Sequence, residues 1–210
     1  MLDKLLGYGT SAAIALVIFS LAPSRADWSD SFAVIPKATG TTAGVKTPLS
    51  LTSLEPKIVQ REAELAVGMG ASYSLEGSKE IVHLWERFKP RIQEVPSAKG
   101  THTLGISCAG LSEISRRPGD AYVYVAAVPV TRAEALPDAM VKVELPAGRY
   151  AVFTHKGPLA NLSSSMDYIW GSWLKRTREK YRNAPSFELY DQRFKSESPE
   201  SEVDIYIPVE

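Results

Sequence analysis

The sequence predicts an α+β fold in which two βαββ units are related by a pseudo-two-fold axis, with antiparallel sheets and with helices on the outer faces of the sheets. Segments with alternating apolar residues, typical of strands, and segments with apolar residues every three or four positions, typical of helices, follow one another in the order strand, helix, strand, strand. This order occurs twice between residues 57 and 210. The last strands of the two units are also alike, reading YVAAVPV at 124–130 and IYIPV at 205–209.

The first unit begins with an alternating segment from Ile58 to Tyr73, which we expect to be a strand. An amphipathic helix follows, with Ser78 available as its N-cap and Pro96 just beyond its end. Its apolar stripe consists of Ile81, Leu84, Trp85, Phe88 and Ile92. Two short strands, at 103–109 and 121–130, complete the unit.

The second unit begins with alternation at 141–145, a break at 146–148 and further alternation at 149–154, which together predict one long, bent strand. A second helix is expected from its apolar stripe of Leu162, Met166, Ile169, Trp170 and Trp173. Strands at 187–190 and 203–207 end the unit. Because ligand pockets favour the seams between structural units, we expect a cleft along the pseudo-axis to hold a ligand.

The 56 residues before this repeat are predicted to direct and tether the domain. Leu5 to Ala22 carry no charge, and Ser24 and Ala26 supply the small residues that a signal peptidase accepts before its cut. Residues 1–26 are therefore predicted to be a signal peptide cleaved after Ala26, or an uncleaved membrane anchor. Residues 27–56 are predicted to be a flexible linker. Either way we expect the domain outside the cytoplasm, either periplasmic or anchored to the inner membrane, and touching the membrane only through this first segment.

Composition argues against several classes of partner and cofactor. Lys and Arg total 24 and Asp and Glu total 24, so the chain has no net positive charge that would attract nucleic acid. None of the three histidines has a second His or Cys at metal-ligand spacing, and no phosphate loop occurs, so we expect neither a metal nor another cofactor. The single cysteine, Cys108, lies among apolar residues and is expected to be buried. His155, beside Lys156–Gly157, is interpreted as a surface or turn residue.

The segment PAGRYAVFTHKGP at 146–158 resembles the central part of GyrI-like small-molecule-binding domains, the effector-binding domains of AraC- and MerR-type bacterial transcription activators. The resemblance covers about residues 57 to 210, and four further segments carry it: LWERF at 84–88, the IW and WL pairs within 169–174, FELYD at 187–191 and IYIPV at 205–209. It implies a sheet-lined aromatic pocket for bulky, often cationic or multi-ring compounds, with a buried glutamate as counter-charge. In activators a DNA-reading module precedes this domain. Here we expect an address segment and a linker instead, and hence no nucleic-acid partner.

The glutamate that the family places in its pocket corresponds to Glu188. Strand alternation puts Glu188 and Tyr190 on one face and Phe187 and Leu189 on the other, so we expect the first pair to face the cleft if the second pair packs under the helices. A carboxylate among aromatic rings is poorly solvated and gains from a cation. The expected ligand-binding residues are Glu188, Tyr190, Trp173, Tyr150, Phe153, Tyr73 and Tyr206. Trp85 and Trp170, within the helical stripes, are expected to pack in the core.

Three functions remain open on the sequence alone. The first is an exported, stand-alone binding protein for hydrophobic or cationic organic compounds, acting as a sensor, a carrier or a sequestering protein. The second is a hydrolase, because some relatives of the family open strained rings of toxic compounds; Glu188 would then be the general base, with Tyr150 or Tyr190 polarising the substrate. The third is haem or tetrapyrrole binding, because SOUL-type proteins resemble the same duplicated architecture. We expect binding rather than catalysis.

Overall fold

The computed structural model describes residues 54–74, 80–111, 114 and 119–210. The predicted signal peptide or anchor at 1–26, the linker up to residue 53 and the expected N-cap at Ser78 lie outside the described residues. Within the described ranges, no helix has both the length and the apolar character needed to span a bilayer.

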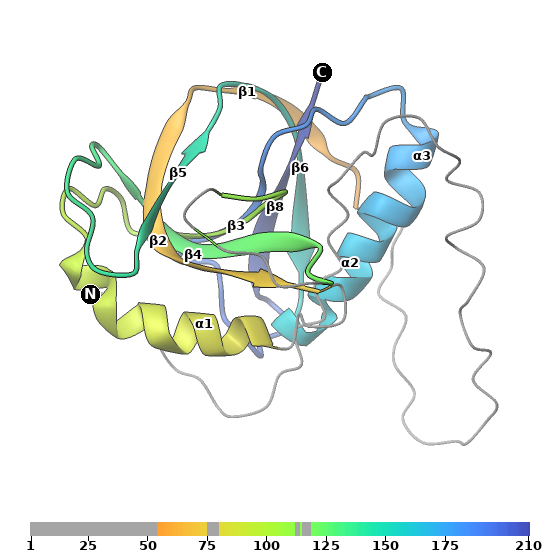
Figure 1. Cartoon of the computed structure of the whole chain (residues 1–210). Coiled ribbons are helices and arrows are strands. Elements are labelled where there is room, and N and C mark those ends of the chain that lie inside the picture. The colour runs from red at the N-terminus through yellow and green to blue at the C-terminus, as the bar shows by residue number, and fades with distance from the viewer. Residues whose placement is uncertain (1–53, 75–79, 112–113, 115–118) are drawn as a thin grey trace.

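A single antiparallel sheet of eight strands, in the order β1-β6-β8-β7-β3-β4-β2-β5, forms the body of the molecule (Figure 1). Its strands are β1 (Lys57–Arg61), β2 (Glu64–Tyr73), β3 (Thr103–Cys108), β4 (Tyr122–Val130), β5 (Val141–Leu145), β6 (Gly148–Lys156), β7 (Ser186–Tyr190) and β8 (Glu202–Val209). The predicted repeat is confirmed as β2-α1-β3-β4 followed by β6-α2-β7-β8. The predicted sheets of the two units are joined into one because β3 pairs with β7, with Gly105 opposite Glu188.

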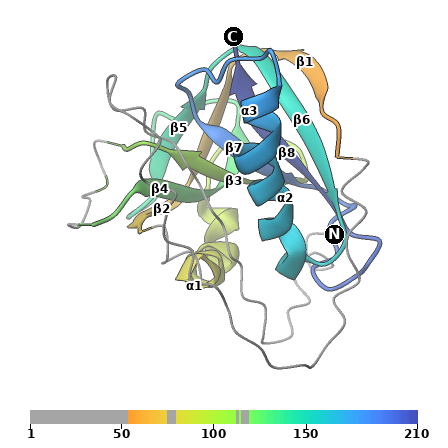
Figure 2. The same ribbon diagram turned by 90° about the vertical axis from the view of Figure 1, so that its right-hand side faces the viewer.

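The two helices pack on one face of the sheet, and Figure 2 shows α1 nearly end-on while α2 and α3 run upright. In the first unit, α1 (Ile81–Phe88) continues as a 3-10 segment, Lys89–Glu94. Pro90 has no N–H to continue the α-helical hydrogen bonds, which explains why the expected helical stripe changes geometry before Ile92. In the second unit, a 3-10 turn leads into α2 (Leu162–Tyr168), a π-helical turn at Ile169–Trp173 and α3 (Leu174–Arg176).

Both units exchange a strand. β1 precedes β2 by two residues but pairs with β6, whereas β2 pairs with β4 and β5. Likewise β5 precedes β6 by two residues but pairs with β2 of the first unit. The segment predicted as one long bent strand in the second unit is extended on both sides of the bend but forms two strands, β5 and β6, with different partners, and the segment predicted as one strand from Ile58 to Tyr73 divides in the same way into β1 and β2.

Both faces of the sheet are buried. The first cluster lies under the helices and combines α1 and α2 with residues of the sheet such as Tyr124, Phe153 and Tyr190. The second cluster lies on the opposite face, where side chains of the edge strand β5 meet those of the central strand β3, including Leu104 and Ile106. Figure 1 shows that the sheet is strongly curled.

Two single-residue expectations have different outcomes. Cys108 is 7% exposed within the second cluster, which confirms that it is buried. The interpretation of His155 as a surface or turn residue is wrong, because this side chain is only 1% exposed. The chain after β6 folds back over the end of the strand, so His155 Nδ1 lies 2.8 Å from Ser165 Oγ and Nε2 lies 3.3 Å from the Pro158 carbonyl oxygen. Burial lowers the pKa of His155, consistent with a neutral imidazole.

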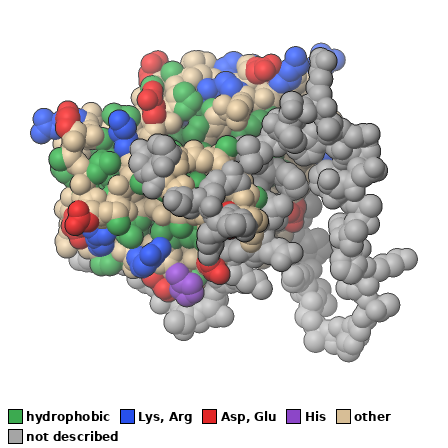
Figure 3. Space-filling view, viewed as in Figure 1, with side chains coloured by type: hydrophobic (Ala, Val, Ile, Leu, Met, Phe, Trp, Pro, Cys, Tyr) green, Lys and Arg blue, Asp and Glu red, His purple; other side chains and the backbone are tan. Residues whose placement is uncertain are grey.

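Basic and acidic side chains alternate over the surface visible in Figure 3, without a large patch of one sign. Among the described residues, several basic and acidic side chains form ion pairs, for example Arg193 with Asp191, Glu202 and Asp204. This face of the described chain therefore offers no extended basic surface of the kind that phosphate backbones attract.

Candidate functional site

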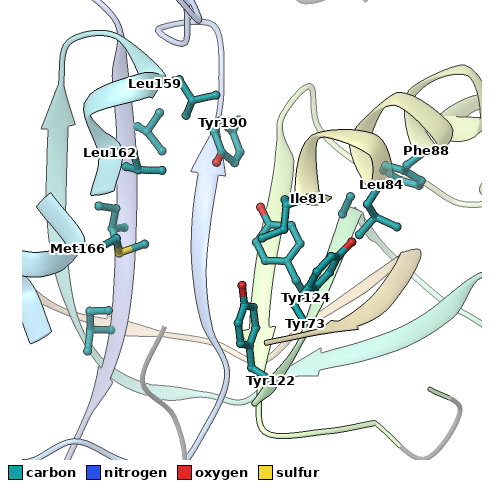
Figure 4. Packing of buried hydrophobic residues seen from close by; sticks show 14 of the residues in the cluster. Tyr73, Ile81, Leu84, Phe88, Tyr122, Tyr124, Leu159, Leu162, Met166 and Tyr190 are labelled. Carbon is teal, nitrogen blue, oxygen red and sulfur yellow. The ribbon is translucent and has the colours of Figure 1, made fainter. Parts of the chain in front are cut away.

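Glu188 is a buried carboxylate on the face of the sheet that carries the helices, and it is only 1% exposed. The hydroxyls of Tyr124 and Tyr190 each donate a hydrogen bond to its Oε2 atom, both at 2.9 Å. Trp85 extends the network from α1, since its indole N–H donates to the Tyr124 hydroxyl at 3.3 Å. Figure 4 shows Tyr190 between the packed residues of the two helices, with Tyr122 and Tyr124 on the α1 side.

A glycine in β3 leaves room for this network where β3 pairs with β7. Gly105 of β3 is paired with Glu188 of β7. A Cβ atom at Gly105 would lie 2.0 Å from the Tyr124 hydroxyl oxygen and 2.5 Å from Glu188 Oε2. Only the absence of a side chain at residue 105 lets the tyrosine and the glutamate meet there.

Burial dominates the electrostatics of the site. It raises the pKa of Glu188 to about 7, although the hydrogen bonds from Tyr124 and Tyr190 partly oppose the rise. Burial and the nearby charge of Glu188 also raise the pKa values of Tyr122 and Tyr124, so both hydroxyls stay protonated at neutral pH. Within the described part of the chain, no Lys, Arg or His forms an ion pair with Glu188. Burial therefore moves the titration of Glu188 toward neutral pH, and no described basic residue forms an ion pair with it.

A cavity of about 480 Å³ lies next to this network. It is bounded by α1 and the following 3-10 segment, by the loop before β3, and by residues of the second unit. Its apolar lining includes Trp85, Ile92, Val95, Leu159, Tyr190 and Phe194. The ring of Tyr190 packs edge-on against the rings of Trp85 and Phe194, with centroid distances of 5.6 Å and 4.9 Å. Glu188 thus lies one side chain behind the aromatic wall of the cavity.

The structure brings some of the expected ligand-binding residues together and separates others. Tyr190 contacts Glu188 and lines the cavity. Tyr73 lies on the same face of the sheet, 6.0 Å from Tyr122 between ring centroids. Phe153 and Trp173 pack against each other at 4.9 Å in the core under α2 and do not line this cavity.

Tyr150 and Tyr206 lie on the opposite face of the sheet, where both rings contact Phe187. The Tyr150 hydroxyl donates to the Pro146 carbonyl oxygen at 2.8 Å. Of the two tyrosines considered for hydrolysis, the structure therefore places Tyr190 at Glu188 and places Tyr150 across the sheet from it.

The helices cover the face of β7 that carries Glu188 and Tyr190, not the face of Phe187 and Leu189. Alternation separated the two pairs correctly but could not tell which pair the helices cover, since both faces of the curled sheet are buried. Trp85, expected to pack only in the core, also lines the cavity, and Tyr124 was not among the expected site residues. The signal that could have found Tyr124 is its spacing from Tyr122, which puts both rings on one face of a strand.

The described residues contain no group of three or more His, Cys, Asp and Glu side chains that could hold a metal ion. The groups that remain for binding are the aromatic wall, its tyrosine hydroxyls and the single buried carboxylate.

Comparison with known protein families identifies one that matches this chain. The family described as Cass2, integron-associated effector binding protein, matches residues 57–209. The chain belongs to this family. The resemblance to effector-binding domains that the sequence indicated is thereby confirmed.

Among curated proteins, the chain is similar to the transcriptional regulator BrlR of Pseudomonas aeruginosa, with 36% identity over 163 residues. The match covers 76% of this chain but only 57% of that relative's length. Among solved structures, the effector-binding fold is shared with SAV2435 bound to tetraphenylphosphonium, with a TM-score of 0.60 and 20% identity over 74% of this chain and 94% of the other. It is also shared with an integron cassette protein of Vibrio cholerae, with a TM-score of 0.52 and 19% identity over 74% and 96% of the two chains.

The raised pKa of Glu188 predicts a pH dependence of stability. Between pH 4.5, the ordinary pKa of a glutamate side chain, and about pH 7, Glu188 has lost its proton in the unfolded chain but keeps it in the folded chain. The free energy of unfolding therefore falls as the pH rises through this range and levels off above it. A difference of this size corresponds to about 3 kcal/mol. Urea unfolding at pH 5 and pH 8 should show this loss in the wild type but not in Glu188→Gln. Equal pH dependence in both proteins would contradict the assignment.

Proposed function

We propose that this chain binds a hydrophobic or cationic organic molecule in the cavity beside Trp85 and Tyr190, with Glu188 as the counter-charge. We further propose that it does so outside the cytoplasm, as a sensor, a carrier or a sequestering protein, in keeping with the apolar segment predicted within residues 1–26. Ligand binding rests on the cavity and the carboxylate; the location rests on the sequence alone.

The observation that carries the proposal is an ionisable carboxylate, 1% exposed and without a cationic partner in the described structure, behind an aromatic cavity wall. Burying such a group without a cation destabilises the folded protein. A lipophilic cation would restore the missing charge pair and would also gain from the faces of the surrounding rings. The cavity volume falls within the range of pockets for drug-sized ligands, roughly 300 to 1,000 Å³.

One structure that shares the fold supports this direction. SAV2435, which shares the fold, is described as bound to tetraphenylphosphonium, a lipophilic cation. BrlR is a transcriptional regulator, but this chain spans only 57% of its length, so regulation of transcription does not transfer with the domain. The proposal takes ligand recognition from SAV2435 alone, through the shared fold.

Tryptophan fluorescence tests the proposal, because Trp85 is part of the cavity wall. We expect tetraphenylphosphonium to quench the emission with a dissociation constant in the micromolar range, on the order of −8 kcal/mol of binding free energy. Trp85→Phe should lose most of the quenching while calorimetry still detects binding.

Trp170→Phe is the matched control, because Trp170 packs against Tyr181 away from the cavity, and this variant should keep the signal. An absence of binding heat up to about 1 mM ligand in the wild type, a free energy weaker than about −4 kcal/mol, would contradict the proposed function.

A further inference from the structure

The carboxylate that we propose as the counter-charge does not itself line the cavity. Glu188 is 1% exposed and is not among the lining residues, whereas Tyr190 lines the cavity and donates a hydrogen bond to Glu188 Oε2 at 2.9 Å. A cation placed in this cavity meets the ring of Tyr190 before it meets the carboxylate. Because Coulomb attraction falls with distance, direct contact with Glu188 stabilises a cation more than attraction across a side chain does. Such contact requires Tyr190 to move.

Tyr190 occupies a position where its side chain can move without breaking the sheet. It is the last residue of β7, and the pairing of β7 with β3 reaches it, opposite Thr103. The pairing of β7 with β8 ends one residue earlier, at Leu189. The chain then enters the segment before β8, which places Phe194 in the cavity lining. Side chains at the ends of strands, next to loops, belong to the parts of a fold that open most easily.

Glu188 keeps one hydrogen-bond donor when Tyr190 leaves. The hydroxyl of Tyr124 donates to the same Oε2 atom at 2.9 Å, and this residue is only 1% exposed. Tyr124 also accepts a hydrogen bond from the indole N–H of Trp85 at 3.3 Å. One carboxylate oxygen thus has a donor within the core and a second donor on the cavity wall.

Removing the second donor has a cost that depends on the ligand. A hydrogen bond to an ionised group stabilises more than one between neutral groups, and a buried carboxylate that loses a donor is poorly solvated. A ligand with a positive charge compensates this loss by its attraction to Glu188. An uncharged ligand offers no such compensation, so its binding favours the arrangement in which Tyr190 stays in place.

We propose that Tyr190 determines the charge selectivity of the cavity. A cationic ligand displaces the Tyr190 hydroxyl from Glu188 and contacts the carboxylate directly, whereas an uncharged aromatic ligand binds with this hydrogen bond intact. The inference rests on the proposed function, since it specifies how the same cavity distinguishes its ligands. It goes beyond that function because Tyr190 competes with the cation for Glu188, in addition to forming part of the wall.

Two ligands that carry phenyl rings on phosphorus test the inference: tetraphenylphosphonium, a cation, and triphenylphosphine oxide, which is uncharged. Calorimetry at pH 8.5 gives the ratio of their affinities. Burial raises the pKa of Glu188 to about 7, so at this pH the carboxylate is ionised even when loss of a hydrogen bond raises its pKa further. We expect the ratio in favour of the cation to rise about tenfold in Tyr190→Phe, because the cation no longer has to break a hydrogen bond to an ionised group.

Tyr168→Phe is the matched control. Tyr168 is the last residue of α2 and does not line the cavity, so the same loss of a hydroxyl there should leave the ratio unchanged. A purely structural role of the Tyr190 hydroxyl would change the affinity for both ligands alike and would also leave the ratio unchanged.

Crystal structures of the two wild-type complexes provide a check that does not depend on how well the variant folds. We expect the Tyr190 hydroxyl to have left Glu188 in the complex with tetraphenylphosphonium and to remain within hydrogen-bond distance in the complex with the oxide. An intact hydrogen bond in the cation complex would overturn the inference, as would an equal or smaller affinity ratio in folded Tyr190→Phe. In both cases cation binding stands. If tetraphenylphosphonium does not bind the folded wild type, the proposed function fails and this inference fails with it.

Discussion

Replacing Glu188 with glutamine is expected to weaken binding of tetraphenylphosphonium by about 100-fold, because the ligand then loses its buried counter-charge, an effect of about 3 kcal/mol. Affinity of the wild type should also rise about tenfold from pH 6 to pH 8, as Glu188 with a pKa of about 7 changes from mostly protonated to mostly ionised. Calorimetric titrations at both pH values measure the two effects. The pH dependence should be absent in Glu188→Gln.

The same substitution should stabilise the protein without ligand. At pH 8 it removes an ionised carboxylate from a site that is 1% exposed, so we expect the free energy of unfolding to increase by about 1 to 2 kcal/mol. Glu144→Gln, at an exposed position of β5, is the matched control and should change neither property. Full retention of cation affinity in Glu188→Gln would exclude Glu188 as the counter-charge.

Gly105→Ala is expected to damage both stability and binding. The added methyl group would lie 2.0 Å from the Tyr124 hydroxyl oxygen and 2.5 Å from Glu188 Oε2. Both groups are buried, so the network must break or the strands must separate, at a cost of about 3 kcal/mol. Urea unfolding measures the loss, and the affinity for tetraphenylphosphonium should fall in the protein that remains folded.

Gly171→Ala provides the comparison for this prediction. Gly171 lies in the π-helical turn, and a Cβ atom there would meet nothing within 4 Å. We expect this variant to be unchanged or more stable by up to about 1 kcal/mol, because alanine favours helix more than glycine does. Two equally stable variants would show that the close approach at Gly105 does not constrain the site.

The order of elements could be predicted from the sequence because each one is encoded locally. The stripe containing Ile81, Leu84 and Phe88 became α1, and the alternation around Tyr124 became β4. The bend at Pro146–Gly148 was also visible, as a break between two alternating segments. The assignment of Glu188 rested on family resemblance, and its burial is what the structure adds.

What the sequence could not predict depends on pairing between distant strands. Alternation in β7 separates Glu188 from Phe187, but it does not say which of the two faces the helices cover when both faces are buried. Tyr150 of β6 and Tyr206 of β8 were expected to line the same pocket as Glu188 and lie on the other side of the sheet. Tyr124 reaches Glu188 only because β4 pairs with β3 and β3 pairs with β7, a relation between residues 64 positions apart.

The exchange of β1 and β5 between the two units has a consequence for how the domain folds. Each unit needs an edge strand that the chain supplies from just before the other unit, so neither unit completes its hydrogen bonding alone. Denaturation should accordingly be all-or-none, without a half-folded intermediate. A ligand that binds beside the β3–β7 seam would then protect amides across the whole sheet from hydrogen exchange, including those far from the cavity.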